Sequence, residues 1–310
     1  MSTVRNLLRF LVISSVACVV LLLVQRAADP CPCRGAVPAR KEQALAANGT
    51  HPSKKKLGVA DEDDDNKLPE ILSRAAMEDK TILMTFTNEA WSAPGSLMDL
   101  FLESFRIGVR TEPLLKHLVI VTADAKAFAR CEQVHALCYA FPGGGANFAK
   151  EQRFVFTDDV DIVWFRNPLL RIPVAVDFAM SADSFYGDNP YDLDKRANGG
   201  FVYAKASPRT VAFYEGWYEA RKRFPGKNEQ DLIQKLEREL AVAHGVTAQF
   251  VDTAYLGGFC ERRKKVMDFN KLCTFHANCL VGLKMKLDRL RGVLDAWKKF
   301  KATNGTVLTD

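Results

Sequence analysis

Residues 81–301 alternate between two hydrophobic patterns. Short apolar runs rich in β-branched residues have strand length, and they occur at 81–86, 118–121, 137–141, 153–157, 176–181, 200–205 and 249–253. Between them, apolar residues spaced three and four positions apart predict helices at 96–105, 124–135, 209–223, 229–240 and 285–301. Strands that alternate with helices predict an α/β fold, with a mostly parallel sheet flanked by helices and ligands at the carboxyl ends of the strands.

The N-terminal pattern is different. Arg5 and Arg9 precede or interrupt an apolar stretch whose unbroken part covers residues 10–24. A membrane span needs about 20 apolar residues, whereas the core of a signal peptide has about 7–15. Because Arg9 can extend its charge toward the headgroups, we expect an uncleaved transmembrane anchor at 7–24 after a cytoplasmic tail at 1–6. The two arginines then place the remainder in the lumen.

A cleaved signal peptide is the alternative, with residues 26–28 as its cleavage region. Residues 25–80 carry prolines, a basic run at 54–56 and an acidic run at 61–65, a composition typical of a disordered lumenal stem. The acidic run is better explained as a flexible spacer than as a metal site. We therefore expect the globular domain at 81–301 and a C-terminal tail at 302–310.

Composition limits the class of protein. The 310 residues are 48% hydrophobic and carry a net charge of +6, so a packed domain is expected, and no nucleic-acid-binding motif is present. The modest basic excess fits a polyanionic ligand such as a nucleotide diphosphate. Sequons at 48–50 and 304–306 agree with a lumenal placement.

The chain has 8 cysteines, which also agrees with an oxidising compartment. The predicted domain contains Cys131, Cys138, Cys260, Cys273 and Cys279. This number is odd, and the sequence leaves their connectivity open. A zinc site built on Cys273, His276 and Cys279 is a rival interpretation, although no second cysteine pair completes it.

The strongest chemical signal is a pair of carboxylates directly after a predicted strand. Asp159 and Asp161 are spaced by one residue, and Asp158 precedes them. Neighbouring carboxylates repel each other, and a hard divalent cation such as Mn²⁺ or Mg²⁺ relieves the repulsion. Such an ion would neutralise the charge that develops on a leaving nucleoside diphosphate. The alternative for a bare pair of this kind is a loop of surface acids.

Other segments offer polar groups near a ligand. Asn198 could contact sugar hydroxyls, and Gly199 and Gly200 permit close backbone approach, although a plain turn before a strand explains them equally. Asp231, after Gln230, either caps a helix or faces a substrate. A lone histidine is more often structural than a ligand, and we expect Trp164, Trp217 and Tyr218 in the core.

Taken together, these segments resemble the plant nucleotide-diphospho-sugar transferase family, which includes arabinosyl- and xylosyltransferases of the cell wall. The stretches that carry the resemblance are Thr87–Trp91, Pro94–Phe105, Asp159–Pro168, Asn198–Phe201, Arg209–Tyr218, Pro225–Lys227, Gln230–Asp231, Tyr255–Cys260 and His276–Cys279. They occur in the family's order over roughly residues 81–301, so chance explains them poorly.

The resemblance implies a GT-A type fold in a single-pass type II Golgi membrane protein with a lumenal catalytic domain. It implies retaining transfer from a UDP-sugar to a glycan or glycoprotein acceptor of the cell wall, with manganese. By position, the metal ligands would be Asp159, Asp161 and His276. Nucleotide and sugar contacts would come from Thr85, Thr87, Asn88, Asp158, Gly199 and Gly200, and the catalytic groups would be Asn198, Gln230 and Asp231.

In a front-side transfer the leaving phosphate accepts the proton of the acceptor, so no protein base is needed. If a side chain assists, Asp231 is the candidate. The sequence departs from the family before residue 153, where glycines at 143–145 replace an expected helix, and Asp158 adds an acid beside the pair. A non-catalytic member that binds nucleotide or glycan is therefore the second hypothesis. A metal-dependent phosphohydrolase ranks last, because the chain has only 5 histidines.

Overall fold

The computed structural model describes residues 67–141, 153–157, 160–261 and 267–303. The expected anchor at 7–24, most of the expected stem and the glycine-rich connection at 143–145 lie outside these residues. Among the residues that the structure describes, no helix combines the length and hydropathy needed to cross a bilayer.

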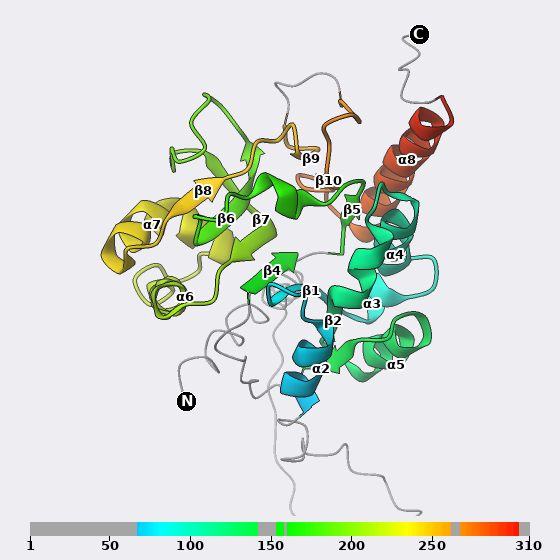
Figure 1. Ribbon diagram of the computed structural model, residues 1–310, viewed down its shortest axis with the longest axis horizontal. Coiled ribbons are helices and arrows are strands. Elements are labelled where there is room, and N and C mark those ends of the chain that lie inside the picture. Colours follow the sequence, from blue (N-terminus) through cyan, green and yellow to red (C-terminus); the bar gives the residue numbers. More distant parts are fainter. Residues whose placement is uncertain (1–66, 142–152, 158–159, 262–266, 304–310) are drawn as a thin grey trace, which may run out of the picture.

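The larger of two sheets has seven strands in the order β3-β2-β1-β4-β7-β6-β8 (Figure 1). The strands are β1 (Thr81–Thr87), β2 (Leu118–Thr122), β3 (Cys138–Ala140), β4 (Arg153–Thr157), β6 (Phe178–Ser184), β7 (Arg196–Ala204) and β8 (Ala248–Phe250). Neighbours pair in parallel except at β7, which runs antiparallel to both β4 and β6. The prediction of an α/β fold with a mostly parallel sheet is confirmed.

Helices cover both faces of this sheet (Figure 1). They are α2 (Lys67–Ala75), α3 (Glu89–Ser92), α4 (Leu97–Ile107), α5 (Ala125–Val134), α6 (Pro208–Ala220), α7 (Glu229–His244) and α8 (Leu283–Ala302), with 3₁₀ turns η2 (Glu112–His117) and η3 (Pro168–Arg171). The helices predicted by apolar spacing are all present, with ends shifted by a few residues.

The period-2 geometry of the strands divides the apolar residues between two cores. In β1, Ile82 and Met84 face the core under α2, α6 and α7, whereas Leu83 faces the core under α4 and α8. Because both faces are buried, these strands read in the sequence as continuous apolar runs. Trp164 and Trp217 lie in the two cores as expected.

Helix α2 corrects the predicted domain boundary. Residues 67–80 were assigned to the stem, but α2 buries Leu68 and Leu72 completely against the sheet. A helix of 9 residues with a single apolar face is short and follows charged runs, so its pattern is easily read as part of the spacer. The folded part therefore starts before Thr81.

A smaller sheet, absent from the sequence prediction, has three strands in the order β5-β10-β9. These are β5 (Ile162–Trp164), β10 (Thr274–His276) and β9 (Leu256–Gly258), each 3 residues long. Strand β10 pairs antiparallel with β5 and parallel with β9. Runs this short carry no readable periodicity, because the pattern needs at least four residues.

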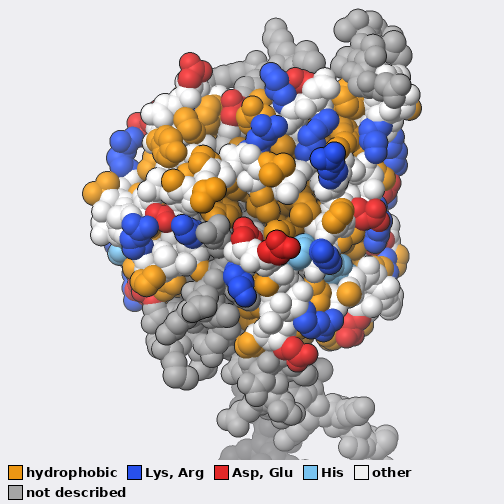
Figure 2. Space-filling view, viewed as in Figure 1, with side chains coloured by type: hydrophobic (Ala, Val, Ile, Leu, Met, Phe, Trp, Pro, Cys, Tyr) orange, Lys and Arg blue, Asp and Glu red, His pale blue; other side chains and the backbone are white. Residues whose placement is uncertain are grey.

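The surface agrees with the modest net charge. On the face shown in Figure 2, basic and acidic side chains are interspersed with apolar ones, without one continuous area of a single sign. Near the middle of this face, acidic side chains lie beside a histidine.

Candidate functional site

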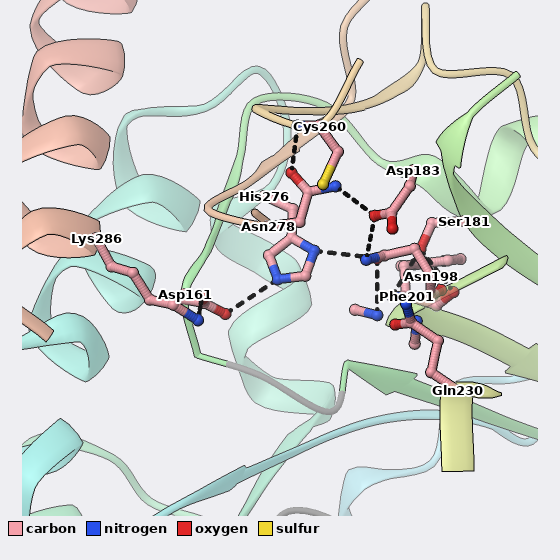
Figure 3. Close-up of polar contacts among 12 residues, drawn as sticks. Asp161, Ser181, Asp183, Asn198, Phe201, Gln230, Cys260, His276, Asn278 and Lys286 are labelled. Atoms are coloured by element: carbon pink, nitrogen blue, oxygen red, sulfur yellow. Dashed lines mark hydrogen bonds and ion pairs between the residues drawn. The ribbon is translucent and has the colours of Figure 1, made fainter. Parts of the chain in front are cut away.

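The small sheet brings two predicted metal ligands together. Asp161 directly precedes β5 and His276 ends β10, and the antiparallel register pairs His276 with Ile162. The backbone N–H of Ala277 donates to the carbonyl of Asp161 at 2.9 Å, which closes the ladder at this end. As a result His276 Nε2 lies 3.2 Å from Asp161 Oδ1, and both residues are buried (Figure 3). The two side chains are 115 positions apart in the sequence. Only the family resemblance predicts that they belong to one site.

A cation completes this cluster from the C-terminal helix. Lys286 lies in the first turns of α8, and its Nζ is 2.6 Å from Asp161 Oδ2 (Figure 3). The same ammonium is 5.2 Å from the centre of the Trp91 ring. Burial alone would raise the pKa of the Asp161 carboxyl, but His276 and Lys286 outweigh burial and hold this pKa below its ordinary value. Asp161 is thus a buried carboxylate.

The Asn198–Gly199–Gly200 segment forms a bulge within β7. The alternative of a plain turn before a strand is therefore wrong. Ser181 pairs with Asn198 while the preceding Met180 pairs with Val202, so the ladder is interrupted across this segment. Side chains take up its backbone donors: Phe201 N–H donates to Ser181 Oγ at 3.1 Å, and Gly200 N–H donates to Asn198 Oδ1 at 3.0 Å. The bulge directs Asn198 toward His276.

Asn198 holds the imidazole of His276. Its Oδ1 lies 3.0 Å from His276 Nδ1, and its Nδ2 donates to Asp183 Oδ1 at 2.9 Å (Figure 3). Ser181 Oγ also donates to Asn198 Oδ1, at 3.1 Å. The amide is therefore engaged with protein groups, and its contact with a sugar hydroxyl stays a prediction.

Gly200 has a steric reason to be glycine. A Cβ built on it would lie 2.4 Å from two atoms of the His276 ring. Its backbone φ is not left-handed, so close packing rather than conformational freedom explains the residue. The backbone of Gly200 thus lies close to the His276 ring, and its close approach to a ligand stays a prediction.

Gln230 and Asp231 begin helix α7 beside the bulge. Gln230 Oε1 accepts a hydrogen bond from Gly199 N–H at 3.2 Å (Figure 3). Asn228 caps the helix by accepting from Asp231 N–H at 2.7 Å, so Asp231 itself is not the cap. Its carboxylate is exposed and lies 3.8 Å from Lys227 Nζ.

Both residues line a cavity of about 510 Å³. The other lining residues are Ser184, Tyr186, Asp194, Lys195, Arg196, Ala197 and Gln234. A cavity of this size is within the range that small ligands occupy, about 300–1,000 Å³. Its wall is fixed by Gln234, which accepts from Ala197 N–H at 2.5 Å and donates to the carbonyl of Lys195 at 2.8 Å.

The predicted nucleotide contacts lie at the carboxyl end of β1. Thr85 and Thr87 are buried, at 0% and 5% exposure. Asn88 is half-buried and caps α3, with its Oδ1 accepting from Trp91 N–H at 3.1 Å. In this conformation the two threonine side chains face the protein interior, and a nucleotide contact by any of the three stays a prediction. Asp158 and Asp159 lie outside the described residues.

The cysteines exclude the zinc interpretation. Cys260 and Cys279 form a disulfide, as do Cys131 and Cys138, while Cys273 is free and buried. Cys279 is therefore unavailable as a thiolate ligand. The carboxylate of Asp183 lies near the Cys260–Cys279 sulfur atoms, but sulfurs joined to each other do not offer thiolates to a metal.

The donor set of Asp161 and His276 fits a divalent cation. One carboxylate oxygen and one imidazole nitrogen 3.2 Å apart have the separation of two adjacent ligands, each about 2.1 Å from a shared ion. Asp161 Oδ1 is buried and accepts no hydrogen bond from the described residues. The imidazole is held through its other nitrogen, as is usual for a ligating histidine.

Sequence reasoning missed Lys286, Asp183 and Asn278. Lys286 had a usable signal, since the first turn of α8 carries no acidic residue and two lysines, the reverse of what the helix dipole favours. Asp183 and Asn278 had none, because their importance comes from contacts across three strands.

This chain is similar to several known proteins. A model of the nucleotide-diphospho-sugar transferase family matches residues 151–290, the segment that contributes Asp161, Asn198, His276 and Lys286. The Arabidopsis thaliana protein named Uncharacterized protein At4g15970 is 38% identical over 271 residues, 80% of this chain and 73% of its own. Uncharacterized protein At1g28695, from the same plant, is 28% identical over 265 residues, 76% of this chain and 78% of its own.

Among solved structures, mouse xyloside xylosyltransferase 1 in its apo form has a TM-score of 0.40 and 13% identity, over 64% of this chain and 98% of its own. A glycosyltransferase involved in glycosylating the major capsid of PBCV-1 has a TM-score of 0.41 and 10% identity, over 68% and 99%. These two likenesses are too distant to carry an argument about the reaction.

The family match and the 38% identical relative place this chain in a class of glycosyltransferases that use nucleotide-diphospho-sugars. The chain belongs to the nucleotide-diphospho-sugar transferase family.

Proposed function

We propose that this chain transfers a sugar, a pentose or galactose, from a UDP-sugar to a cell-wall glycan or glycoprotein, with retention of configuration and dependence on Mn²⁺ or Mg²⁺. One observation carries the proposal: Asp161 Oδ1 and His276 Nε2 converge at 3.2 Å in a buried place after the carboxyl end of the strands. A buried carboxylate and an imidazole this close together would be stabilised by a cation that both donor atoms contact.

Asp161 and His276 would hold the ion, and Asp159 is the third ligand by prediction. When bound, the ion supplies positive charge that stabilises the leaving diphosphate. The protein fixes the positions of the two donor atoms. The β5–β10 ladder fixes the backbone of both residues, and Asn198 fixes the orientation of the His276 imidazole.

Lys286 would bind the diphosphate. Its side chain is 17% accessible, and it lies near the positive end of the α8 dipole. A cation is unfavourable at a helix N-terminus unless anions are near. Asp161 supplies one anion, and the phosphates of a donor nucleotide would supply the others.

The cavity beside Gln230 and Asp231 would accommodate the transferred sugar with the acceptor hydroxyl. Gln230 connects its wall to Gly199 and so to the bulge that contacts His276. In a front-side transfer the leaving phosphate accepts the proton, so Asp231 need only orient the acceptor. Its exposed carboxylate is suited to hydrogen-bonding hydroxyl groups.

The cellular setting belongs to the same proposal: a single-pass type II protein of the Golgi membrane, anchored by residues 7–24 with the domain in the lumen. The two disulfides support an oxidising compartment. Fusion of the full chain to a glycosylation reporter, with protease protection of sealed microsomes, would test it. A protease-accessible C-terminus would contradict the lumenal orientation.

The reaction is tested with the purified full chain and UDP-arabinofuranose, UDP-xylose and UDP-galactose, with and without Mn²⁺, by measuring UDP release. We expect release from one donor that EDTA abolishes. Asp161→Asn and His276→Gln should each reduce it at least about 100-fold, as removal of a charge-stabilising group does elsewhere. Full turnover in EDTA, or in both variants, would overturn the metal-dependent mechanism.

The second candidate is a non-catalytic member that binds nucleotide or glycan. Comparing the Tm with the turnover distinguishes this candidate from the enzyme, because a ligand that binds the folded state raises Tm whether or not it is consumed. If UDP with Mn²⁺ raises Tm while no donor is hydrolysed or transferred, this second function holds.

A further inference from the structure

We infer that Asp183 is a positioning residue for the metal site: acting through the amide of Asn198, it fixes the orientation of the His276 imidazole so that Nε2 points at Asp161. The inference rests on the proposed function, which makes Asp161 and His276 metal ligands. Asp183 is not among the residues that line the cavity, and it acts through Asn198 rather than as a ligand itself.

Asp183 lies near the end of β6 and is 6% exposed. Its Oδ1 accepts two hydrogen bonds, one from Asn198 Nδ2 and one from Asn278 Nδ2, both at 2.9 Å (Figure 3). Asn198 is on the neighbouring strand β7, and Asn278 follows His276 by two residues. One carboxylate oxygen therefore joins the bulge in the large sheet to the end of the small sheet.

The orientation of both amides follows from chemistry alone. An ionised carboxylate only accepts hydrogen bonds, so each amide must turn its NH₂ toward Asp183. The opposite ends meet backbone N–H groups, which only donate: Gly200 N–H reaches Asn198 Oδ1 at 3.0 Å, and Cys260 N–H reaches Asn278 Oδ1 at 3.1 Å. Neither amide can turn over without placing like groups against each other at both ends.

The tautomer of His276 follows in turn. Asn198 presents its oxygen to His276 Nδ1 at 3.0 Å, so Nδ1 must carry the proton and donate. In a neutral imidazole the other nitrogen, Nε2, then carries a lone pair in place of a proton, and it lies 3.2 Å from Asp161 Oδ1. A ligating histidine needs this arrangement, in which the second nitrogen is bound to a fixed acceptor.

Two described neighbours, Arg196 and Ser181, act as donors here and do not replace Asp183 as an acceptor. Arg196 Nε lies 3.8 Å from Asp183 Oδ2, and its side chain is 71% exposed, so this ion pair is weak and brings only a donor. Ser181 Oγ donates to Asn198 Oδ1, at the end of the amide away from Asp183. Without Asp183, the NH₂ groups of Asn198 and Asn278 would lose this shared acceptor in a buried place.

The test uses the full chain with Asp183→Ala and Asp183→Asn. The alanine variant removes the acceptor, and the asparagine variant keeps one oxygen of the same shape. Nitrogen-15 spectra of labelled histidine report which ring nitrogen carries the proton, and the His276 signal is assigned by its loss in His276→Gln. Electron paramagnetic resonance of free Mn²⁺ gives the affinity for the ion alone.

We expect wild type at alkaline pH to hold the proton on Nδ1. In Asp183→Ala the two tautomers should mix, and Mn²⁺ affinity should fall about 10- to 100-fold, the usual effect of removing a partner that orients a ligand. Asp183→Asn should keep the Nδ1–H form and lose less affinity. If Asp183→Ala does not fold, Asp183→Ser, which keeps a small acceptor, takes its place with an intermediate expected effect.

Asp177 provides the matched control. It precedes the same strand at its other end, is 3% exposed, and accepts hydrogen bonds from Arg209 at 3.1 Å and from Thr247 N–H at 3.0 Å. Asp177→Ala should lower Tm while leaving the His276 tautomer and Mn²⁺ affinity unchanged. Unchanged tautomer and affinity in Asp183→Ala would overturn the inference. If wild type binds no Mn²⁺, the metal proposal fails separately, and the tautomer still decides the role of Asp183.

Discussion

At the scale of single residues, the candidate site depends on contacts that leave no spare space. Gly200 faces the ring of His276, and Gly258 faces Asn278, where an added Cβ would lie 2.3 Å from the amide oxygen. Both glycines therefore hold room for side chains that position the cluster. Helical Gly292, by contrast, has nothing within 4 Å of the corresponding position.

Gly200→Ala should weaken Mn²⁺ binding at least about 10-fold, because the methyl group must displace the imidazole from Asn198. Gly292→Ala is the control and should raise stability by about 0.5–1 kcal/mol, since alanine is the better helix former. Mn²⁺ titration and urea unfolding of both variants measure the two effects. Normal Mn²⁺ affinity in Gly200→Ala would show that His276 is not a ligand in the position described.

Lys286→Met should weaken binding of UDP about 10- to 100-fold, because a charge-assisted hydrogen bond to phosphate is worth roughly 1.5–3 kcal/mol. Lys284→Met is the control: that side chain is 90% exposed and pairs with Asp288 on the same helix. Calorimetric titration with UDP compares them. If the two variants lose equal affinity, Lys286 contributes only general charge and does not bind the diphosphate.

At the scale of elements, the site depends on a three-stranded sheet whose strands have only 3 residues each. The Cys260–Cys279 disulfide spans 19 positions, starts two residues after β9 and closes a loop that contains β10. Within that closure Asn278 Oδ1 accepts a hydrogen bond from Cys260 N–H. The disulfide and the β5 ladder together keep His276 near Asp161.

Replacing Cys260 and Cys279 by serine should reduce the free energy of unfolding by about 3 kcal/mol, and replacing Cys131 and Cys138 by somewhat less, because the second loop is shorter. Only the first pair should also lower Mn²⁺ affinity. Denaturant unfolding with parallel Mn²⁺ titration would reveal this. Equal effects of both replacements on Mn²⁺ affinity would contradict a local role for the Cys260–Cys279 bond.

The large sheet could be predicted from the sequence, and the small one could not. Strands such as 81–87 and 118–122 are buried on both faces, so each is a mostly apolar run without alternation of apolar and polar residues. Strands β5, β9 and β10 have 3 residues each and depend on pairing between distant segments, which no local pattern encodes. The same difference separates Asp161, recognised beside its strand, from Asp183, whose partners lie on other strands.

At the scale of the whole molecule, stability should depend on pH through a group remote from the cluster. Glu237 of α7 is 3% exposed, and its carboxyl oxygens have no hydrogen-bond partner among the described residues. Burial is the main cause that raises the pKa of the Glu237 carboxyl to about 9. Of the nearby charges, Arg238 lowers this pKa and Asp194 raises it. In the unfolded chain the pKa of a glutamate is about 4.3.

Between these two pKa values the folded protein keeps a proton that the unfolded chain has lost. Rising pH therefore favours unfolding, and the contribution of Glu237 decreases by about 1.4 kcal/mol per pH unit in this window. Glu237→Gln should remove this dependence and be more stable than wild type at pH 8, with a smaller difference at pH 5. Urea unfolding at both pH values measures the effect.

Glu239→Gln, on the exposed side of the same helix, is the control and should follow the wild-type pH profile. A wild-type stability that rises between pH 5 and pH 8 relative to Glu237→Gln would show that Glu237 is charged in the folded protein.

The order in which the cluster appears along the chain has a consequence for biosynthesis. Asp161, Asn198, His276 and Lys286 come from the second half of the sequence, and α8 is the last described helix, packed through Trp297 onto Phe165. A nascent chain that still holds residue 286 inside the ribosomal tunnel has already synthesised every strand of the large sheet, yet it lacks one member of the cluster. The cluster formed by Asp161, Asn198, His276 and Lys286 is therefore completed only after the strands of the large sheet have been synthesised.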